Sequence, residues 1–340
     1  MAAAGYDTFL VVADGKGNET IDEVQILDAG APRGRFDRMW NATRRIYAMA
    51  KRLGADIYHL HDPELMVTGL ALRLSGKKVV FDAHEDLPKQ LLTKPYLPAW
   101  SRRSLACVAG VVESVVLRSM SGLVAATPAI ERKLKRYNRA VIVNNYPLPS
   151  QLCSPYHDCP KNNEVSYIGG VTRIRGSQEL VRAMVLVKSG ARLNLAGPIE
   201  SESFRSELEM EAGWSAVNLL GVIGREEVSE TLARSIAGLV TFLPLPNHVE
   251  AQPNKMFEYM AAGLPVVASH FPLWREIIEE VGCGVCVDPS RPEDIASAID
   301  WLIEHPEEAR AMGARGRAAI YDRFNWSTEA ESLIRYYEQL

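Results

Sequence analysis

The stretch PNHVEAQPNKMFEYMAAGLPVVASHFPLWRE, residues 246–276, places two glutamates eight positions apart across a helix start and follows them with a buried strand. Pro253 has its φ pre-set for a first helical turn, so we predict that the helix begins there. Glu250 then lies in the preceding loop and Glu258 in the second turn. The Ala-Ala-Gly stop and the apolar run 264–269 predict a helix end and a strand buried on both faces. Such a junction directs a carboxylate pair at a polyhydroxylated ligand.

The start of this predicted helix also favours an anion. Its first backbone N–H groups, near Asn254 and Lys255, have no partner within the helix and form the positive end of the helix dipole. One turn of chain is therefore predicted to hold a phosphate at the helix N-terminus and sugar hydroxyls on two carboxylates.

Strands and helices alternate along the whole chain, a pattern typical of parallel sheets covered on both faces. A length of 340 residues predicts two domains, at about 150 residues per domain. We predict an α/β protein with two Rossmann-like domains that face a cleft. The expected divisions are an N-terminal domain 1–148, a linker 149–163, a C-terminal domain 164–324 and a C-terminal helix 325–340, which is a candidate to pack back on the first domain. The predicted strands of the first half are 8–14, 56–61, 77–84, 121–127 and 140–145.

Two other classes of site are disfavoured. No strand is followed by G-x-G-x-x-G, since DGKGNE at 14–19 fails at the third glycine, and this argues against a double-Rossmann dehydrogenase. The CGVC at 283–286 lies in a strand that runs into a helix start, which argues against zinc or redox chemistry. Five cysteines without a signal peptide favour reduced thiols and a cytoplasmic protein.

The E-x7-E pair followed by MAAGLPVVAS and REII resembles the donor-site signature of retaining glycosyltransferase family 4, nucleotide-sugar enzymes of the GT-B fold. The resemblance implies that Glu250 contacts the transferred sugar and that Glu258 holds the ribose hydroxyls. The alternative is an ordinary acidic helix with solvated carboxylates.

Two further segments, YHLHDPEL at 58–65 and FDAHEDLPKQ at 81–90, resemble paired cleft-facing loops of one branch of this family. The resemblance places the active-site histidine, beside the transferred sugar, at His84. His59 and His61 alternate on a predicted strand, where a histidine is more often structural. For His61 a structural role and a position lining the cleft are equally favoured. For His59 the structural role is favoured.

The segment YIGGVTRIRGSQELVRAM at 167–184 resembles the family's strand, glycine loop and basic pair. Gly170 stands where the family usually has an arginine. Arg175 takes the position of the family's lysine, and Arg173 would reach the same diphosphate from two residues away. Guanidinium groups suit phosphate oxygens because they donate paired hydrogen bonds. The alternative is a solvated surface pair.

The chain lacks a D-x-D triplet, the usual carrier of a catalytic divalent ion in the other large glycosyltransferase fold, so we predict no metal and no cofactor. Arg175, Arg173, Lys255 and the helix dipole at Asn254 would neutralise the leaving diphosphate. The resemblance implies hexosyl transfer with retention of the anomeric configuration, without an enzymic nucleophile. The departing phosphate would take the acceptor's proton, while Glu250 would position the sugar.

The opening residues MAAAGYDTFLVVADGKG resemble the end of the family's first helix and its second strand. We therefore expect the first strand, its glycine loop and most of that helix to be absent from this sequence, which would leave strand edges without hydrogen-bond partners. This expectation keeps open an alternative function, a catalytically inactive GT-B protein that acts as a binding partner or scaffold.

Residues 1–150 carry 21 Lys/Arg against 15 Asp/Glu, a net charge of +6, and the remaining residues carry 17 against 27, a net charge of −10. A basic first half would attract an anionic acceptor or membrane surface, although plain solubility explains it equally well. In 98–120 a tryptophan and two arginines precede an apolar helix too short to span a bilayer. For this helix, packing on the sheet is favoured over insertion into an anionic leaflet. The two roles are compatible, since opposite sides of the helix can serve them.

The resemblance implies a UDP-sugar or GDP-sugar donor and a glycan or lipid-linked acceptor in cell-surface polysaccharide synthesis. It also implies peripheral attachment at the cytoplasmic face of the membrane, and no nucleic-acid partner is predicted.

Overall fold

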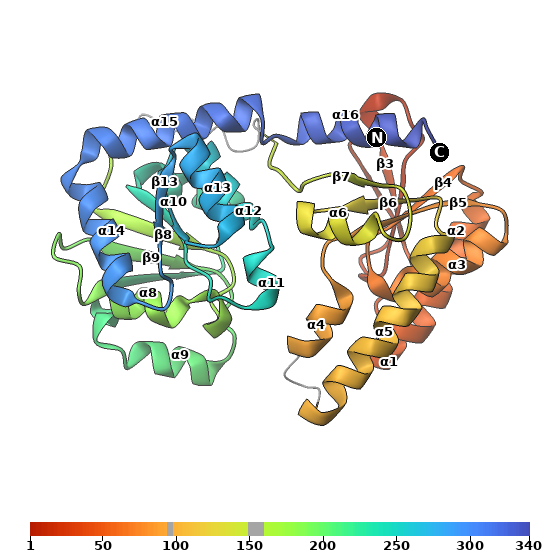
Figure 1. Ribbon diagram of the computed structural model, residues 1–340, viewed down its shortest axis with the longest axis horizontal. Helices are drawn as coiled ribbons and strands as arrows, with labels where there is room; N and C mark the ends of the chain where they lie inside the picture. Colours follow the sequence, from red (N-terminus) through yellow and green to blue (C-terminus); the bar gives the residue numbers. More distant parts are fainter. Residues whose placement is uncertain (94–97, 149–159) are drawn as a thin grey trace. The chain divides into compact units, whose positions relative to one another are not determined.

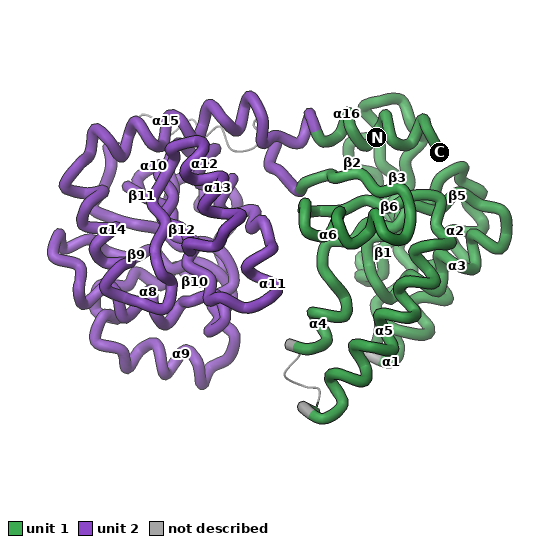
Figure 2. Tube along the Cα trace, viewed as in Figure 1, with its two compact units in different colours: residues 1–144, 329–340 green, residues 145–328 purple. Residues whose placement is uncertain are grey.

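The computed structural model describes residues 1–93, 98–148 and 160–340, and the chain divides into two compact units (Figures 1 and 2). Unit 1 comprises residues 1–144 and 329–340, and unit 2 comprises residues 145–328. The last helix, α16 (Trp326–Tyr337), begins in unit 2 and continues into unit 1. Most of the predicted linker 149–163 lies outside the described residues.

Unit 1 contains a four-stranded parallel sheet in the order β4-β5-β6-β7. Its strands are β4 (Ile57–Leu60), β5 (Lys78–Ala83), β6 (Gly122–Ala125) and β7 (Ala140–Ile142). The hydroxyl of Tyr336 in α16 accepts a hydrogen bond from Leu123 N and donates one to Arg139 O. This side chain ties the C-terminal residues to the ends of β6 and β7.

A second sheet of unit 1 has the order β1-β3-β2, with β1 (Phe9–Val12) parallel to β3 (Val24–Asp28) and β2 (Glu19–Ile21) antiparallel to it. The sequence analysis missed β2 and β3. Asp22 and Glu23 both have positive φ, as a tight hairpin turn requires, but the pair lacks the glycine that usually marks such a turn.

Among the described residues β1 pairs only with β3 and β4 pairs only with β5, so each has one edge without a neighbouring strand. The half-exposed side chains of Phe9 and Leu10 lie on β1.

The helices of unit 1 are α1 (Arg35–Asp37), α2 (Thr43–Leu53), α3 (Met66–Leu74), α4 (Leu87–Thr93), α5 (Ala99–Ser119) and α6 (Pro128–Leu134). Three of them, α3, α5 and α6, contribute the buried side chains Leu72, Leu117 and Leu134 to the core beside the larger sheet. Among the described residues, every helix is too short or too polar to cross a bilayer.

Unit 2 contains one parallel sheet in the order β10-β9-β8-β11-β12-β13. Its strands are β8 (Glu164–Ile168), β9 (Arg192–Ala196), β10 (Val217–Gly221), β11 (Ala237–Val240), β12 (Val266–Ser269) and β13 (Gly284–Val287). The chain winds outward from β8 to β10 and then returns to β11 beside β8. In such sheets ligands bind beyond the carboxyl ends of the strands at this point of reversal.

Figure 1 shows helices packed around this sheet. They are α8 (Ser177–Met184), α9 (Glu202–Glu209), α10 (Arg225–Arg234), α11 (Pro246–Val249), α12 (Asn254–Ala261), α13 (Pro272–Val281), α14 (Pro292–Glu304) and α15 (Pro306–Asp322). The predicted α/β class with two Rossmann-like domains is confirmed.

The helix predicted to begin at Pro253 begins one residue later. Pro253 has φ −73° and ψ 126°, so it is the extended N-cap of α12 rather than its first residue. The pyrrolidine ring fixes only φ and leaves ψ free to remain extended. The segment before it is held in place because the Trp274 indole Nε1 donates a 2.6 Å hydrogen bond to Ala251 O.

Candidate functional site

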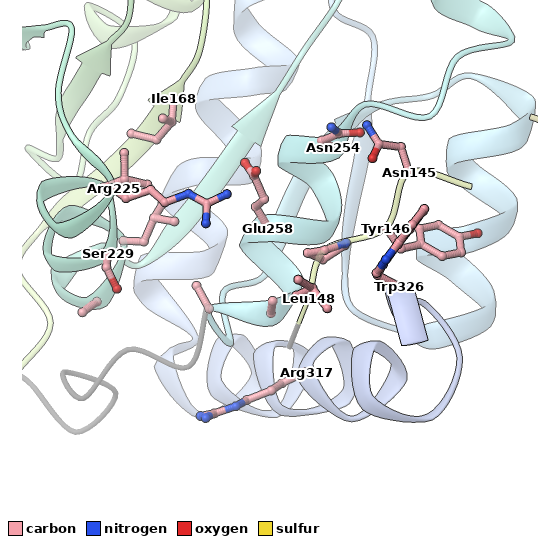
Figure 3. Close-up of a pocket in the computed structure, with 16 residues that line it drawn as sticks. Asn145, Tyr146, Leu148, Ile168, Arg225, Ser229, Asn254, Glu258, Arg317 and Trp326 are labelled. Atoms are coloured by element: carbon pink, nitrogen blue, oxygen red, sulfur yellow. The ribbon is translucent and has the colours of Figure 1, made fainter. Parts of the chain in front are cut away.

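A cavity of about 480 Å³ opens in unit 2 beside α12, at the point where the winding of the sheet reverses (Figure 3). Ile168 contributes from the end of β8. Asn254 and Glu258 contribute from α12, where residues four apart share one face. Arg225 and Ser229 of α10 lie on another wall. The remaining lining residues are Asn145, Tyr146, Pro147, Leu148, Val228, Leu232, Ala233, Ala261, Ala262, Arg317 and Trp326.

The Glu258 carboxylate is the acidic group of this cavity. Figure 3 shows it on the same side of α12 as Asn254, with the Arg225 guanidinium extending toward it. Burial raises the pKa of the Glu258 carboxyl above its ordinary value, while the charges of Lys255 and Arg225 act in the opposite direction. A half-buried carboxylate of this kind can accept hydrogen bonds from two adjacent hydroxyls.

The Lys255 ammonium is buried against the glycine loop that follows β8. Its Nζ lies 3.6 Å from the ring centroid of Tyr167 and has no hydrogen-bond partner among the described residues. Gly169 has φ 130°, and a Cβ there would lie 2.8 Å from Lys255 Nζ. Gly169 must therefore be glycine for the loop to approach this charge.

Arg175 also lies against this loop. Its Nη1 is 2.9 Å from the position that a Cβ on Gly170 would occupy. Lys255 and Arg175 thus bring two cationic groups to one short turn of backbone, next to the cavity wall formed by Ile168. Burial, followed by repulsion from Arg175, lowers the pKa of Lys255 well below its ordinary value. An anion held between the two cations would reverse that shift.

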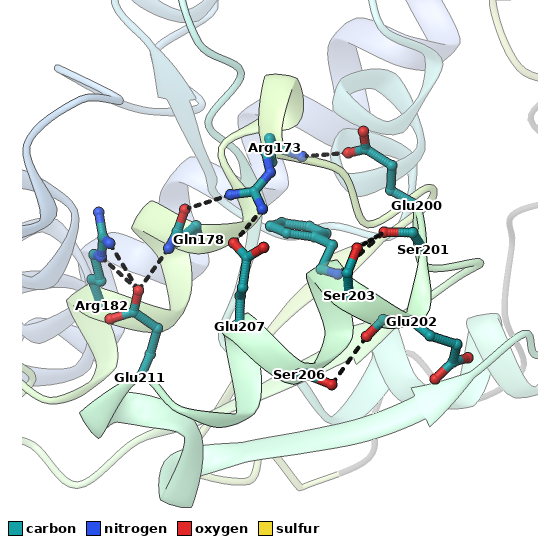
Figure 4. Close-up of polar contacts among 11 residues, drawn as sticks. Arg173, Gln178, Arg182, Glu200, Ser201, Glu202, Ser203, Ser206, Glu207 and Glu211 are labelled. Carbon is teal, nitrogen blue, oxygen red and sulfur yellow. Dashed lines mark hydrogen bonds and ion pairs between the residues drawn. The ribbon is translucent and has the colours of Figure 1, made fainter.

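Arg173 does not join this pair. Figure 4 shows its guanidinium ion-paired with Glu207 of α9, and the group also lies 4.7 Å above the Phe204 ring. Its backbone N–H donates to Glu200 Oε2 at 3.0 Å. Residues two apart on a tight helical turn point to different sides, so Arg173 and Arg175 diverge.

Glu250 follows the short helix α11, is exposed, and does not line the cavity. Of the predicted donor-side residues, the structure therefore places Asn254 and Glu258 in the cavity, and it places Lys255, Arg175 and Gly170 at the adjoining loop. Sequence reasoning missed Arg225. The sequence feature that could have indicated Arg225 is the Gly-Arg pair that opens a helix after β10. This helix start follows the end of a strand, as the glycine loop after β8 does.

The histidines of unit 1 gather around a residue that the sequence analysis did not single out, Asp82 of β5. Its Oδ2 lies 3.2 Å from His59 Nε2, 3.3 Å from His61 Nδ1 and 3.4 Å from His84 Nε2. Burial acts to raise the pKa of Asp82, but hydrogen bonds from the three imidazoles hold it far below its ordinary value. The signal for Asp82 was its position two residues before His84 on the same strand.

Two family models together match most of the chain. The model described as "Glycosyl transferase 4-like domain" matches residues 1–145, and the model described as "Glycosyl transferases group 1" matches residues 162–305.

Two relatives that match about half of the chain are glycosyltransferases by name. A D-inositol 3-phosphate glycosyltransferase of Segniliparus rotundus is 30% identical over 187 residues, which cover 52% of this chain and 40% of that protein. A GDP-mannose-dependent alpha-(1-6)-phosphatidylinositol dimannoside mannosyltransferase of Mycobacterium tuberculosis is 33% identical over 145 residues, 42% of this chain and 35% of that protein. The match thus spans less than half of either relative.

The fold as a whole is similar to that of a sucrose-phosphate synthase from Thermosynechococcus elongatus. The TM-score is 0.78 at 20% identity, and the match covers 99% of this chain and 90% of that one.

The lowered pKa of Lys255 predicts proton uptake when UDP or GDP binds. Free Lys255 loses its proton at a lower pH than an ordinary lysine, and a bound diphosphate favours its charged form, so binding at a pH between the two pKa values takes up part of a proton and affinity falls as pH rises through the lowered pKa. Calorimetry in buffers of different ionisation enthalpy measures this uptake. Lys255→Gln should abolish it, and Lys188→Gln, at an exposed position, should not. An enthalpy independent of the buffer would contradict the assignment.

Proposed function

Because this chain belongs to the GT4-type glycosyltransferases of the GT-B fold, we propose that it transfers a sugar from a nucleoside diphosphate donor, with retention of configuration, to a glycan or lipid-linked acceptor in cell-surface polysaccharide synthesis. The observation that carries this proposal is the unpartnered Lys255 ammonium beside the Gly169–Gly170 loop. A buried charge without a partner costs several kcal/mol. A bound diphosphate would supply the missing partner.

The proposed donor lies along the cavity and the loop. Its ribose diol donates hydrogen bonds to Glu258, and its base occupies the cavity beside Ile168 and Arg225. The diphosphate lies between Lys255 and Arg175, near the N-terminus of α12. The Mycobacterium tuberculosis relative is named as GDP-mannose-dependent, which supports a nucleotide sugar, and both UDP and GDP donors remain candidates.

The proposed reaction proceeds on one face of the sugar. As the bond to the leaving oxygen lengthens, negative charge builds on the diphosphate, and Lys255, Arg175 and the α12 dipole stabilise it. The departing phosphate accepts the proton of the attacking hydroxyl, while Glu250 positions the sugar. Arg173 is paired with Glu207, so its contact with the diphosphate stays a prediction of the sequence. The position of His84 beside the sugar stays a prediction of the resemblance.

Glu258→Ala should weaken binding of the cognate nucleoside diphosphate by about tenfold or more. A carboxylate that accepts hydrogen bonds from a diol contributes about 1.5–3 kcal/mol, and 1.4 kcal/mol is tenfold in affinity. Glu279→Ala provides the matched control, since Glu279 is exposed on α13 and pairs only locally with Arg275. Calorimetry measures both variants, and thermal melting checks that each is folded. Unchanged affinity in Glu258→Ala would remove Glu258 from the donor site.

Donor turnover should persist in a chelator, because Lys255 and Arg175 are proposed to neutralise the leaving group. The measurement is release of UDP or GDP from a panel of nucleotide sugars, with and without EDTA. Loss of turnover in EDTA that Mg²⁺ or Mn²⁺ restores would contradict the proposed stabilisation. Binding of donor without any turnover would favour the alternative of a catalytically inactive binding protein.

We also propose that α5 attaches the protein to an anionic membrane surface. The helix buries Val116 and Leu117 in unit 1, as the sequence favoured, but its other side is apolar and exposed. That exposed side comprises Leu105, Val108, Val111, Val112 and Val115, each between 42 and 62% exposed. Trp100, 84% exposed, and Arg103 lie near its start, and such a combination is typical of helices that lie in a headgroup layer.

The attachment is tested by flotation with vesicles of phosphatidylcholine alone or mixed with an anionic lipid. The protein should float only with the anionic vesicles, less so at high salt, and Val108→Asp should reduce binding severalfold. Val222→Asp, at an exposed apolar position of unit 2, should not. Equal flotation of the two variants, or none of the unchanged protein, would rule out this surface.

A further inference from the structure

The cluster around Asp82 brings together the residue types and the spacing of a metal site. Hydrogen bonds from nitrogen to oxygen are about 2.7–3.2 Å long, and about 2.7–2.9 Å when both groups are charged. Here three imidazole nitrogens converge on the single oxygen Oδ2 at 3.2, 3.3 and 3.4 Å. Four ligands bound at 2.0–2.1 Å around a tetrahedral ion stand about 3.3 Å apart. The three separations from Oδ2 match that spacing, and the ligand atoms of His59, His61 and Asp82 all lie within 4.8 Å of one another.

The other oxygen of the carboxylate gives an independent observation. Asp82 Oδ1 is buried and has no hydrogen-bond partner among the described residues, and the Asp82 side chain is only 11% exposed. Three imidazoles competing for hydrogen bonds would be expected to use this free oxygen. If the carboxylate binds an ion through Oδ2, the imidazoles bind the same ion. Oδ1 is then left without a hydrogen bond from them.

His59 has the outer contact that metal-bound histidines show. Its Nε2 faces Asp82, and its Nδ1 is hydrogen-bonded to the Tyr337 hydroxyl. In metal sites the second ring nitrogen of a histidine is almost always held in this way, which fixes the tautomer and the orientation of the ring. His61 stacks on His59 with ring centroids 4.6 Å apart, so its ring is oriented as well.

We propose that His59, His61 and Asp82 bind a divalent transition-metal ion of the Zn²⁺ type. Their ligand atoms all lie within 4.8 Å of one another. His84 Nε2, 3.5 Å from His61 Nδ1, stands beside the remaining position of the ion. Imidazole and carboxylate suit Zn²⁺, and three protein ligands leave one position open. The sequence analysis predicted no metal from the lack of a D-x-D triplet, and it did not single out Asp82, around which the histidines gather.

This site lies in unit 1, and the donor cavity lies in unit 2, so the inference does not rest on the proposed function. An ion here would occupy the surroundings of His84. We therefore expect Zn²⁺ to inhibit any sugar transfer that requires a free His84. This expectation agrees with the predicted persistence of donor turnover in a chelator.

The test uses the untagged full chain after treatment with a chelator. Co²⁺ is added as a spectroscopic probe, since a tetrahedral site gives intense visible absorption, and Zn²⁺ is then used to displace it. A single tetrahedral ion should bind. His61→Ala should reduce affinity by about 100-fold, and Tyr337→Phe, which removes the outer contact of His59, by about tenfold. His305→Ala, at an exposed histidine of unit 2, is the matched control.

His61 is largely exposed, so the metal-free His61→Ala variant should melt at the temperature of the unchanged protein, and UDP affinity should be the same in all variants. These controls separate loss of the metal site from unfolding and from failure of the donor site. Absence of tetrahedral absorption, or equal Co²⁺ affinity in His61→Ala and the unchanged protein, would overturn the proposal and indicate a hydrogen-bonded cluster.

Discussion

The buried ammonium of Lys255 constrains the structure of unit 2 around it. Its charge lies over the Tyr167 ring and 2.8 Å from the position of a Cβ on Gly169, whose φ of 130° already favours glycine in the loop after β8. Burial of an unpaired charge is unfavourable, and the protein reduces that cost by lowering the pKa of the lysine. The arrangement becomes favourable when an anion binds between Lys255 and Arg175.

The same geometric rule places the polar groups of both units. Parallel strands end at a common edge, and the residues just beyond their carboxyl ends converge there. In unit 2 this brings together Gly169, Arg225 and Glu258. In unit 1 it brings His59, His61 and His84 to Asp82, where three imidazoles face one carboxylate oxygen. In unit 2 this edge presents cationic groups, and in unit 1 it presents imidazoles and a carboxylate.

The sequence determined the features that depend on neighbouring residues. Pro253, the Ala-Ala-Gly stop and the apolar run 264–269 specify α12 and β12 almost to the residue, because proline, glycine and β-branched residues restrict the backbone locally. The spacing of Asn254 and Glu258 places both on one helix face, and both line the cavity. The hairpin at Asp22 was missed, since its turn conformation is stabilised by strand pairing rather than by its own residue types.

Only the tertiary structure decided which charged groups share an environment. Arg173 and Arg175 were both predicted to reach the diphosphate, but Arg173 meets Glu207 of α9, whereas Arg175 meets the glycine loop. Asp82 was not singled out in the sequence, yet strand pairing of β4 with β5 surrounds it with histidines. Local backbone preferences act over a few residues and can be read along the chain, while pKa shifts and ligand geometry depend on groups that only folding brings together.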